Sequence, residues 1–158
     1  MGRVTSLDFF ELDVFSTGAF TGNPLAVICG ADHLTTEQMQ RIAAWTNFSE
    51  TTFLLEPTND KADYRVRIFT PVEEYAFAGH PTLGTARAWL ELGNTPKTTD
   101  SVVQECGVGN VQVRISDNKL AFATPPLKQS DPLSGRERAD ICDVFGVAEA
   151  SLVDAAWG

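Results

Sequence analysis

The 158-residue chain lacks several features that would assign it to a special class of protein. Its longest apolar runs, such as Pro24 to Cys29, are far too short to cross a bilayer. The N-terminus, Met1 to Asp8, has no apolar signal core, so secretion is not expected. Basic residues are few: Lys and Arg total 12 against 21 Asp and Glu, and the net charge of -9 argues against nucleic-acid binding. We therefore expect a cytoplasmic protein with neither a membrane nor a nucleic-acid partner.

Cysteine and histidine are also scarce. Cys29, Cys106 and Cys142 are an odd number without metal-ligand spacing, which predicts free and mostly buried thiols. With two scattered histidines and no Cys/His cluster, the sequence predicts no catalytic metal. The Gly107-Val108-Gly109 segment lacks the third glycine and the following helix of a dinucleotide loop, and Ser49 lacks the Gly-x-Ser-x-Gly setting of a serine hydrolase.

What is present is the composition of a packed domain, with 43% hydrophobic and 21% charged residues. Alternating or β-branched apolar stretches predict strands over 7–16, 25–29, 51–55, 64–69, 101–105, 111–116 and 120–124. Because these strands come in hairpin-linked runs and not in strict βαβ alternation, the expected fold class is α+β with a mixed or antiparallel sheet.

Two helices are expected within this part of the chain. Thr35 can cap the Gln38 amide while the Gln38 side chain reaches back, which predicts a helix from there to about Trp45. Residues 82–92 are apolar nearly all round, and a helix of that kind belongs in the middle of a domain. We expect the sheet to curl around it.

The domain organisation is expected to change near Pro125-Pro126, where the strand pattern ends. The following stretch to Ser134 is polar and reads as a linker, and a helix then opens whose one face is apolar. The sequence therefore predicts an N-terminal domain over 1–125. Residues 126–158 would be a linker and the start of an incomplete second domain.

The first candidate for chemistry is Glu50, in the segment Asn47-Phe48-Ser49-Glu50-Thr51-Thr52-Phe53. It stands where a predicted helix ends and a predicted strand begins. If Phe48 and Phe53 enclose the carboxylate, lost hydration raises its pKa and allows proton exchange near neutral pH. The alternative is a solvated loop carboxylate, which is the commoner situation for glutamate.

The second candidate is the segment Gly79-His80-Pro81-Thr82-Leu83-Gly84, which leads into the apolar helix. Backbone amides of His80, Thr82 and Leu83 would gather at the positive end of that helix, as a receptor for a carboxylate or a developing oxyanion. His80 could donate a hydrogen bond to a substrate carboxylate or relay a proton. A histidine that caps the helix or packs locally is an equal alternative.

Five segments, in this order, carry a family resemblance: Asp13-Val14-Phe15, Gly22-Asn23-Pro24-Leu25-Ala26-Val27, Asn47-Phe48-Ser49-Glu50-Thr51-Thr52-Phe53, Arg67-Ile68-Phe69-Thr70-Pro71 and Phe77-Ala78-Gly79-His80-Pro81-Thr82-Leu83-Gly84-Thr85-Ala86. Together they closely resemble the phenazine-biosynthesis (PhzF-like) isomerase family, which shares the diaminopimelate-epimerase fold. The resemblance implies two similar α+β domains with the active site in the cleft between them. It also implies a homodimeric, cofactor-free isomerase that moves a proton on a small carboxylate-bearing substrate.

The resemblance also implies roles for particular residues. The glutamate of the Ser-Glu-Thr-Thr motif transfers the proton in this family, which places that role on Glu50. The Gly-His-Pro-Thr stretch lines the substrate site, which places binding on Gly79, His80 and Thr82. Asn23 of the Gly-Asn-Pro motif is expected nearby.

Two departures from the family pattern suggest alternatives. In the epimerase relatives a catalytic cysteine precedes the glycine of the helix-entry motif, and here Ala78 holds that place. A two-base amino-acid epimerase or racemase is therefore less favoured than a one-base isomerase. Family members are also roughly twice as long, as two domains would require. A catalytically inactive domain, truncated and acting as a binding, structural or dimerising module, is the second alternative.

Overall fold

The computed structural model describes residues 6–123 and 132–152. The chain divides into two compact units, residues 1–123 and 124–158, and each is treated by itself. The predicted break at Pro125-Pro126 lies outside the described residues.

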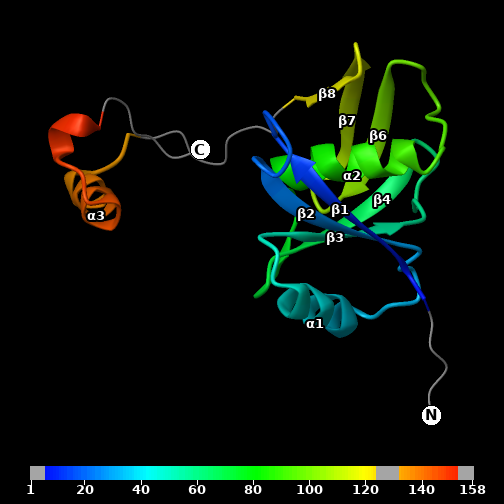
Figure 1. The fold of residues 1–158 in the computed structure, drawn as a ribbon, viewed down its shortest axis with the longest axis horizontal. Helices are drawn as coiled ribbons and strands as arrows, with labels where there is room; N and C mark the ends of the chain where they lie inside the picture. The colour runs from blue at the N-terminus through cyan, green and yellow to red at the C-terminus, as the bar shows by residue number, and fades with distance from the viewer. Residues whose placement is uncertain (1–5, 124–131, 153–158) are drawn as a thin grey trace. The chain divides into compact units, whose positions relative to one another are not determined.

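The first unit is built on one eight-stranded mixed sheet (Figure 1). Its strands are β1 (Asp8–Val14), β2 (Asn23–Cys29), β3 (Thr51–Leu55), β4 (Tyr64–Phe69), β5 (Glu74–Tyr75), β6 (Ser101–Cys106), β7 (Gly109–Ser116) and β8 (Lys119–Phe122). The strand order is β1-β2-β3-β4-β6-β7-β8, with β5 paired to β4. The pairs β2–β3 and β4–β6 are parallel and the others are antiparallel. All the predicted strands are confirmed. The structure adds the two-residue strand β5, which the sequence did not predict.

Helix α2 (Gly79–Glu91) lies across the inner face of this sheet (Figure 1). Its apolar neighbours come from strands on both sides of the unit, including Val14, Val66 and Val113. The helix starts at Gly79, three residues before the predicted start, because Ala78 in extended conformation is its N-cap. The α+β fold, with a mixed curled sheet around a central apolar helix, is confirmed.

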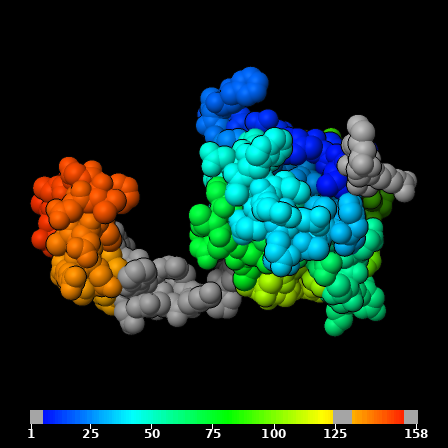
Figure 2. Space-filling model, turned by 90° about the horizontal axis from the view of Figure 1, so that it is seen from below, coloured from blue at the N-terminus to red at the C-terminus, as the bar shows by residue number. Residues whose placement is uncertain are grey.

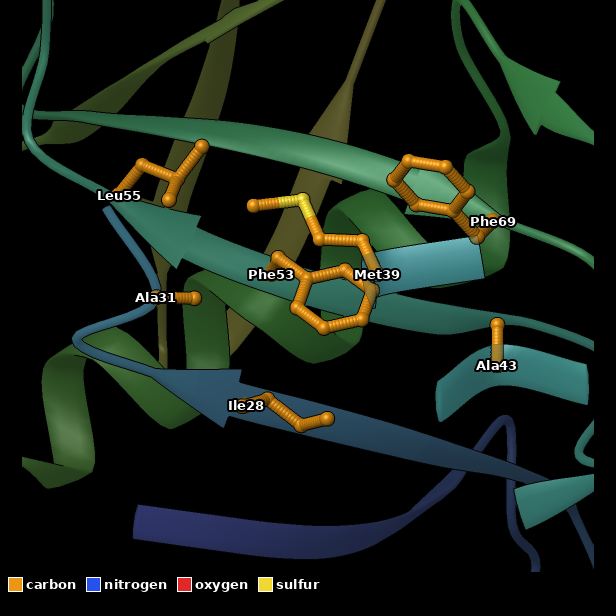
Figure 3. Packing of buried hydrophobic residues seen from close by; sticks show 7 residues of the cluster. All are labelled: Ile28, Ala31, Met39, Ala43, Phe53, Leu55 and Phe69. Carbon is orange, nitrogen blue, oxygen red and sulfur yellow. The ribbon is translucent and has the colours of Figure 1, made fainter. Parts of the chain in front are cut away.

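Helix α1 (Thr36–Thr46) packs on the opposite face of the sheet and forms the outside of the unit (Figure 2). The predicted capping box is present: the Thr35 hydroxyl accepts from the Gln38 amide, and the Gln38 side chain accepts from the Thr35 amide. Met39 and Ala43 face a cluster that includes Phe53 and Phe69 (Figure 3). Alternation along β3 therefore separates Phe53, on the α1 side, from Thr52, whose hydroxyl contacts α2.

The described part of the second unit contains α3 (Gly135–Phe145) and the short 3₁₀ helix η1 (Glu149–Ser151). Ser134 and Glu137 form a capping box at the start of α3. Cys142 is buried, whereas Val144 and Phe145 are exposed. The apolar face predicted for this helix is thus only partly covered.

Candidate active site

Glu50 and His80 meet at one point although 30 residues separate them in the chain. Oε2 of Glu50 lies 3.1 Å from Nδ1 of His80, and the two side chains are 18% and 8% exposed. Glu50 directly precedes β3, and His80 lies in the first turn of α2. The solvated-loop alternative for Glu50 is therefore wrong, because its carboxylate is sheltered against the helix start.

The two threonines that follow Glu50 connect its segment to helices α1 and α2 through hydrogen bonds. Thr51 exchanges a hydrogen bond with Thr46, in the last turn of α1, over 3.1 Å between their hydroxyl oxygens. Thr52 accepts a hydrogen bond from the Thr85 hydroxyl of α2 over 2.9 Å. Both threonines are fully buried. The segment that carries Glu50 is thus tied to α1 by one residue and to α2 by the next.

Two buried atoms of this pair have no hydrogen-bond partner among the described residues: Oε2 of Glu50 and Nε2 of His80. The carboxylate and the ring are close enough for an ion pair, but the ring N–H is not aligned on Oε2 as a hydrogen bond. Buried polar atoms in folded proteins are nearly always paired with protein or water. Oε2 of Glu50, besides its ion-pair contact, and Nε2 of His80 can therefore each still form a hydrogen bond.

The start of α2 adds hydrogen-bond donors beside this pair. Its N-cap is Ala78, which has no side-chain cap, and the first turn contains no acidic residue. The first amides of a helix have no partner within it, so those of Gly79 and His80 stay available to an anion, while Pro81 has none to offer. A Cβ at position 79 would lie 3.0 Å from Cζ of Phe122, so a larger residue there would require the phenyl ring to shift slightly.

Asn23 lies at the same end of the sheet as Glu50, at the start of β2, and is exposed. The Ser49 hydroxyl donates a hydrogen bond to Oδ1 of Asn23 over 3.1 Å. The structure thus links Asn23 to the residue that precedes Glu50. The sequence argued against Ser49 as a nucleophile and did not predict this hydrogen bond, although Ser49 lies in the same motif as Glu50.

Thr82 occupies a different position from the other site candidates. It is fully buried, its hydroxyl donates to the Ala78 carbonyl oxygen over 2.9 Å, and its amide donates to the same oxygen over 3.2 Å. The Thr82 amide, which the sequence predicted to face an anion, is therefore already hydrogen-bonded within the helix. The buried Thr82 side chain therefore stabilises the first turn of α2, and neither its hydroxyl proton nor its amide is free to bind an anion.

The expected enclosure of Glu50 by two aromatic rings also needs correction. Phe53 is fully buried in the cluster beneath α1 (Figure 3). Its neighbour Thr52 instead contacts α2. Phe48 is partly buried and its ring packs near that of Phe9, with centroids 6.5 Å apart. Glu50 is sheltered through its place against α2, not by Phe53.

Potential metal ligands do not gather within residues 6–123 and 132–152. No group of three or more His, Cys, Asp or Glu side chains there could hold a metal ion. The three cysteines are free, as predicted, with Cys29 and Cys142 buried. None of the helices in these ranges has the length and apolar character that crossing a membrane requires.

Comparisons with known proteins agree on one family. Residues 12–150 match the family described as phenazine biosynthesis-like protein (PhzC-PhzF). Antisense-enhancing sequence 1 of Schizosaccharomyces pombe is 50% identical over 130 residues, which are 79% of this chain and 44% of that protein. A trans-2,3-dihydro-3-hydroxyanthranilate isomerase of Pseudomonas aeruginosa is 53% identical over 80 residues, which are 51% of this chain and 28% of that protein.

A solved structure shares the fold. The PhzF-family phenazine biosynthesis protein of Bacillus anthracis superimposes with a TM-score of 0.76 and 29% identity, covering 93% of this chain and 49% of that one. The chain therefore spans about half the length, or less, of these relatives. All five segments that carry the sequence resemblance fall within the matched range 12–150.

Proposed function

Because the chain belongs to the PhzC-PhzF family of phenazine biosynthesis-like proteins, as its motifs predicted, we propose that it forms the proton-transfer half of an isomerase. Its substrate is a small molecule that carries a carboxylate. Glu50 is the general acid and base, and His80, Gly79 and Asn23 bind the substrate. The observation that supports this assignment is the adjacent Glu50 and His80 pair with its two unpartnered buried atoms.

The chemistry needs one carboxylate. Ionised Glu50 takes a proton from one carbon of the substrate, the electron pair moves through the conjugated system, and the resulting carboxylic acid returns a proton to a second carbon. Bonds and electrons balance within the substrate, so the step needs no oxidant or reductant. A positioned general acid or base of this kind contributes about 10²–10⁴-fold to the rate.

The helix start supplies the complementary charge. A carboxylate on the substrate, or negative charge that develops on it, would face the free amides of Gly79 and His80 at the positive end of α2. An imidazole N–H of His80 can donate a further hydrogen bond. The net charge of -9 gives the chain no general attraction for anions, so donors at a specific place would have to supply it.

A two-base epimerase is less well supported. It needs a second acid on the opposite side of the reacting carbon. The residue before Gly79 is Ala78, whose methyl group cannot exchange a proton. The geometry around Glu50 therefore favours movement of a proton between two carbons of one substrate.

The test is the variant Glu50→Gln in the protein that carries this sequence, with trans-2,3-dihydro-3-hydroxyanthranilate as the probe substrate. We expect a loss of isomerisation, and of deuterium uptake from D₂O, of about 10²-fold or more. Glu56→Gln is the control, since Glu56 is exposed and directly follows β3. Turnover by Glu50→Gln within tenfold of the unaltered protein would remove Glu50 from the mechanism. If the unaltered protein leaves the probe unchanged, that substrate is excluded.

A further inference from the structure

A buried chain of hydrogen bonds leads from the sheet to the start of α2. The Tyr64 hydroxyl donates to Oε1 of Gln104 over 3.1 Å, and Nε2 of Gln104 donates to Oγ1 of Thr82 over 3.0 Å. The Thr82 hydroxyl then donates to the Ala78 carbonyl oxygen over 2.9 Å. Tyr64 is 1% exposed and both Gln104 and Thr82 are fully buried, so these bonds are shielded from solvent.

The direction of these bonds follows from the groups themselves. A hydroxyl has a single proton, and because the Gln104 amide nitrogen donates to Thr82, that proton is free to go to Ala78. The reversed Gln104 amide would place an acceptor against Thr82, and Thr82 would then have to give up either Gln104 or Ala78. Only the observed orientation makes all three contacts at once, which a buried network requires.

The end point of the chain is the residue that precedes the proposed site. Ala78 is the N-cap of α2 and has no side-chain cap of its own. Its carbonyl oxygen accepts both the amide and the hydroxyl of Thr82. The next two residues, Gly79 and His80, supply the free amides and the imidazole. Whatever fixes Ala78 therefore fixes the direction in which those groups point.

The other end of the chain is anchored in the sheet. Tyr64 on β4 and Gln104 on β6 are register partners in the parallel β4–β6 pair. A second tie joins α2 to the sheet one turn later, where Thr85 donates to Thr52 of β3. Thr82 and Thr85 are three residues apart and lie on the same face of the helix. The bond from Gln104 to Thr82 is thus a hydrogen bond between the first turn of α2 and the sheet, in addition to the one that Thr85 makes.

We infer that Gln104 is a positioning residue, which holds the first turn of α2 through Thr82 and Ala78 and so keeps His80 against Glu50. This inference rests on the proposed function and deepens it, since it says what sets the geometry of the pair. An apolar side chain at position 104 could fill the same space in the core. It would leave the Tyr64 hydroxyl without its acceptor and would remove the hydrogen bond that the Thr82 hydroxyl accepts, so that Thr82 would keep only its bond to Ala78. The network therefore specifies one arrangement of the helix start.

The test reads the contact between Glu50 and His80 directly. His80 and the exposed His33 are the only histidines, so ¹⁵N-labelled histidine gives a site signal and an internal reference in one spectrum of the full chain. Glu50→Gln should displace the His80 ring signals and leave those of His33 in place. In a Gln104→Met background this displacement should fall below half, and Thr82→Val should act in the same way. Thr82→Ser, which keeps the hydroxyl, should restore most of it.

A purely structural role for Gln104 would lower the unfolding temperature and leave the displacement intact. A folded Gln104→Met variant with the full displacement therefore overturns the inference, as does a Glu50→Gln change that His80 does not sense at all. If Gln104→Met fails to unfold cooperatively, Thr82→Val decides by the same criterion. Because the readout needs no turnover, this inference can fail while Glu50 proves catalytic, and it can hold where the probe substrate is not converted.

Discussion

The Glu50 carboxylate and the His80 imidazole lie 3.1 Å apart, from Oε2 to Nδ1, and each presents a buried atom that no described residue satisfies. The distance is set by elements on either side of the pair. On one side, Thr52 of β3, two residues after Glu50, accepts a hydrogen bond from Thr85 of α2. On the other side, Thr82 donates a hydrogen bond to Ala78, and these two residues flank His80. The fold itself therefore holds the two side chains next to each other.

Ser49→Ala is expected to weaken substrate binding more than catalysis. The change removes the hydrogen bond that orients Asn23, an exposed contact of the kind that contributes about 1 kcal/mol. We expect the KM of the converted substrate to rise by about fivefold, with kcat within twofold, because Glu50 itself stays in place. Steady-state kinetics measure both constants, and Ser49→Thr, which retains a hydroxyl, is the control. A fall in kcat at constant KM would contradict this role.

Gly84→Ala is expected to destabilise the first unit. A Cβ at position 84 would lie 2.4 Å from Cδ2 of Leu25 and 2.9 Å from Cγ2 of Val14, both buried. Overpacking of this kind costs about 1–3 kcal/mol, which outweighs the gain of roughly 0.5–1 kcal/mol that alanine usually brings to a helix. Denaturant unfolding measures the difference.

A Leu25→Ala background provides the control for this prediction. With the Leu25 side chain shortened, the space for the new methyl group exists, and Gly84→Ala should then cost clearly less than in the unaltered chain. Equal costs in both backgrounds would show that the close approach of α2 to β2 does not limit residue 84.

Cys29 is expected to react slowly with alkylating reagents. Burial, and secondly the charge of Asp8, raise the pKa of its thiol to about 11. A raised thiol pKa means less thiolate, so at pH 8 the reactive fraction is roughly 100-fold smaller than for an unperturbed thiol with a pKa of 9.0. Iodoacetamide labelling followed by peptide mass spectrometry should find Cys29 protected in the folded chain and labelled in urea. Asp8→Asn should speed labelling modestly, and labelling in the folded chain at the urea rate would refute the prediction.

Much of the local structure was predictable because its causes lie within a few residues. The capping box of Thr35 and Gln38 needs only residues three apart, and it formed as expected. The apolar character of 82–92 is enough to place that helix inside the sheet. The residue at which a helix begins was less predictable from local spacing. Helix α2 starts at Gly79 because Ala78, in extended conformation, is its N-cap, whereas the apolar pattern begins only at residue 82.

The five ordered segments likewise predicted the family from the sequence alone. They also predicted that Glu50 and His80 belong to one site, and the structure brings these two side chains together. A sequence motif can indicate which residues belong together, but it does not give the distances between their side chains. Gln104 belongs to none of the five segments, and its proposed role depends on the register that pairs it with Tyr64 and on its hydrogen bond to Thr82.

The sequence by itself determined the family and most of the elements, including the capping box of α1. The tertiary structure decided which face of β3 each side chain takes, so that Phe53 packs beneath α1 while Thr52 reaches α2. It also decided that Glu50 touches His80 and that Thr82 turns inward. The physical reason is that caps and periodicity depend on neighbours in the chain, whereas contacts between residues tens of positions apart depend on strand register and on how closely a helix crosses the sheet.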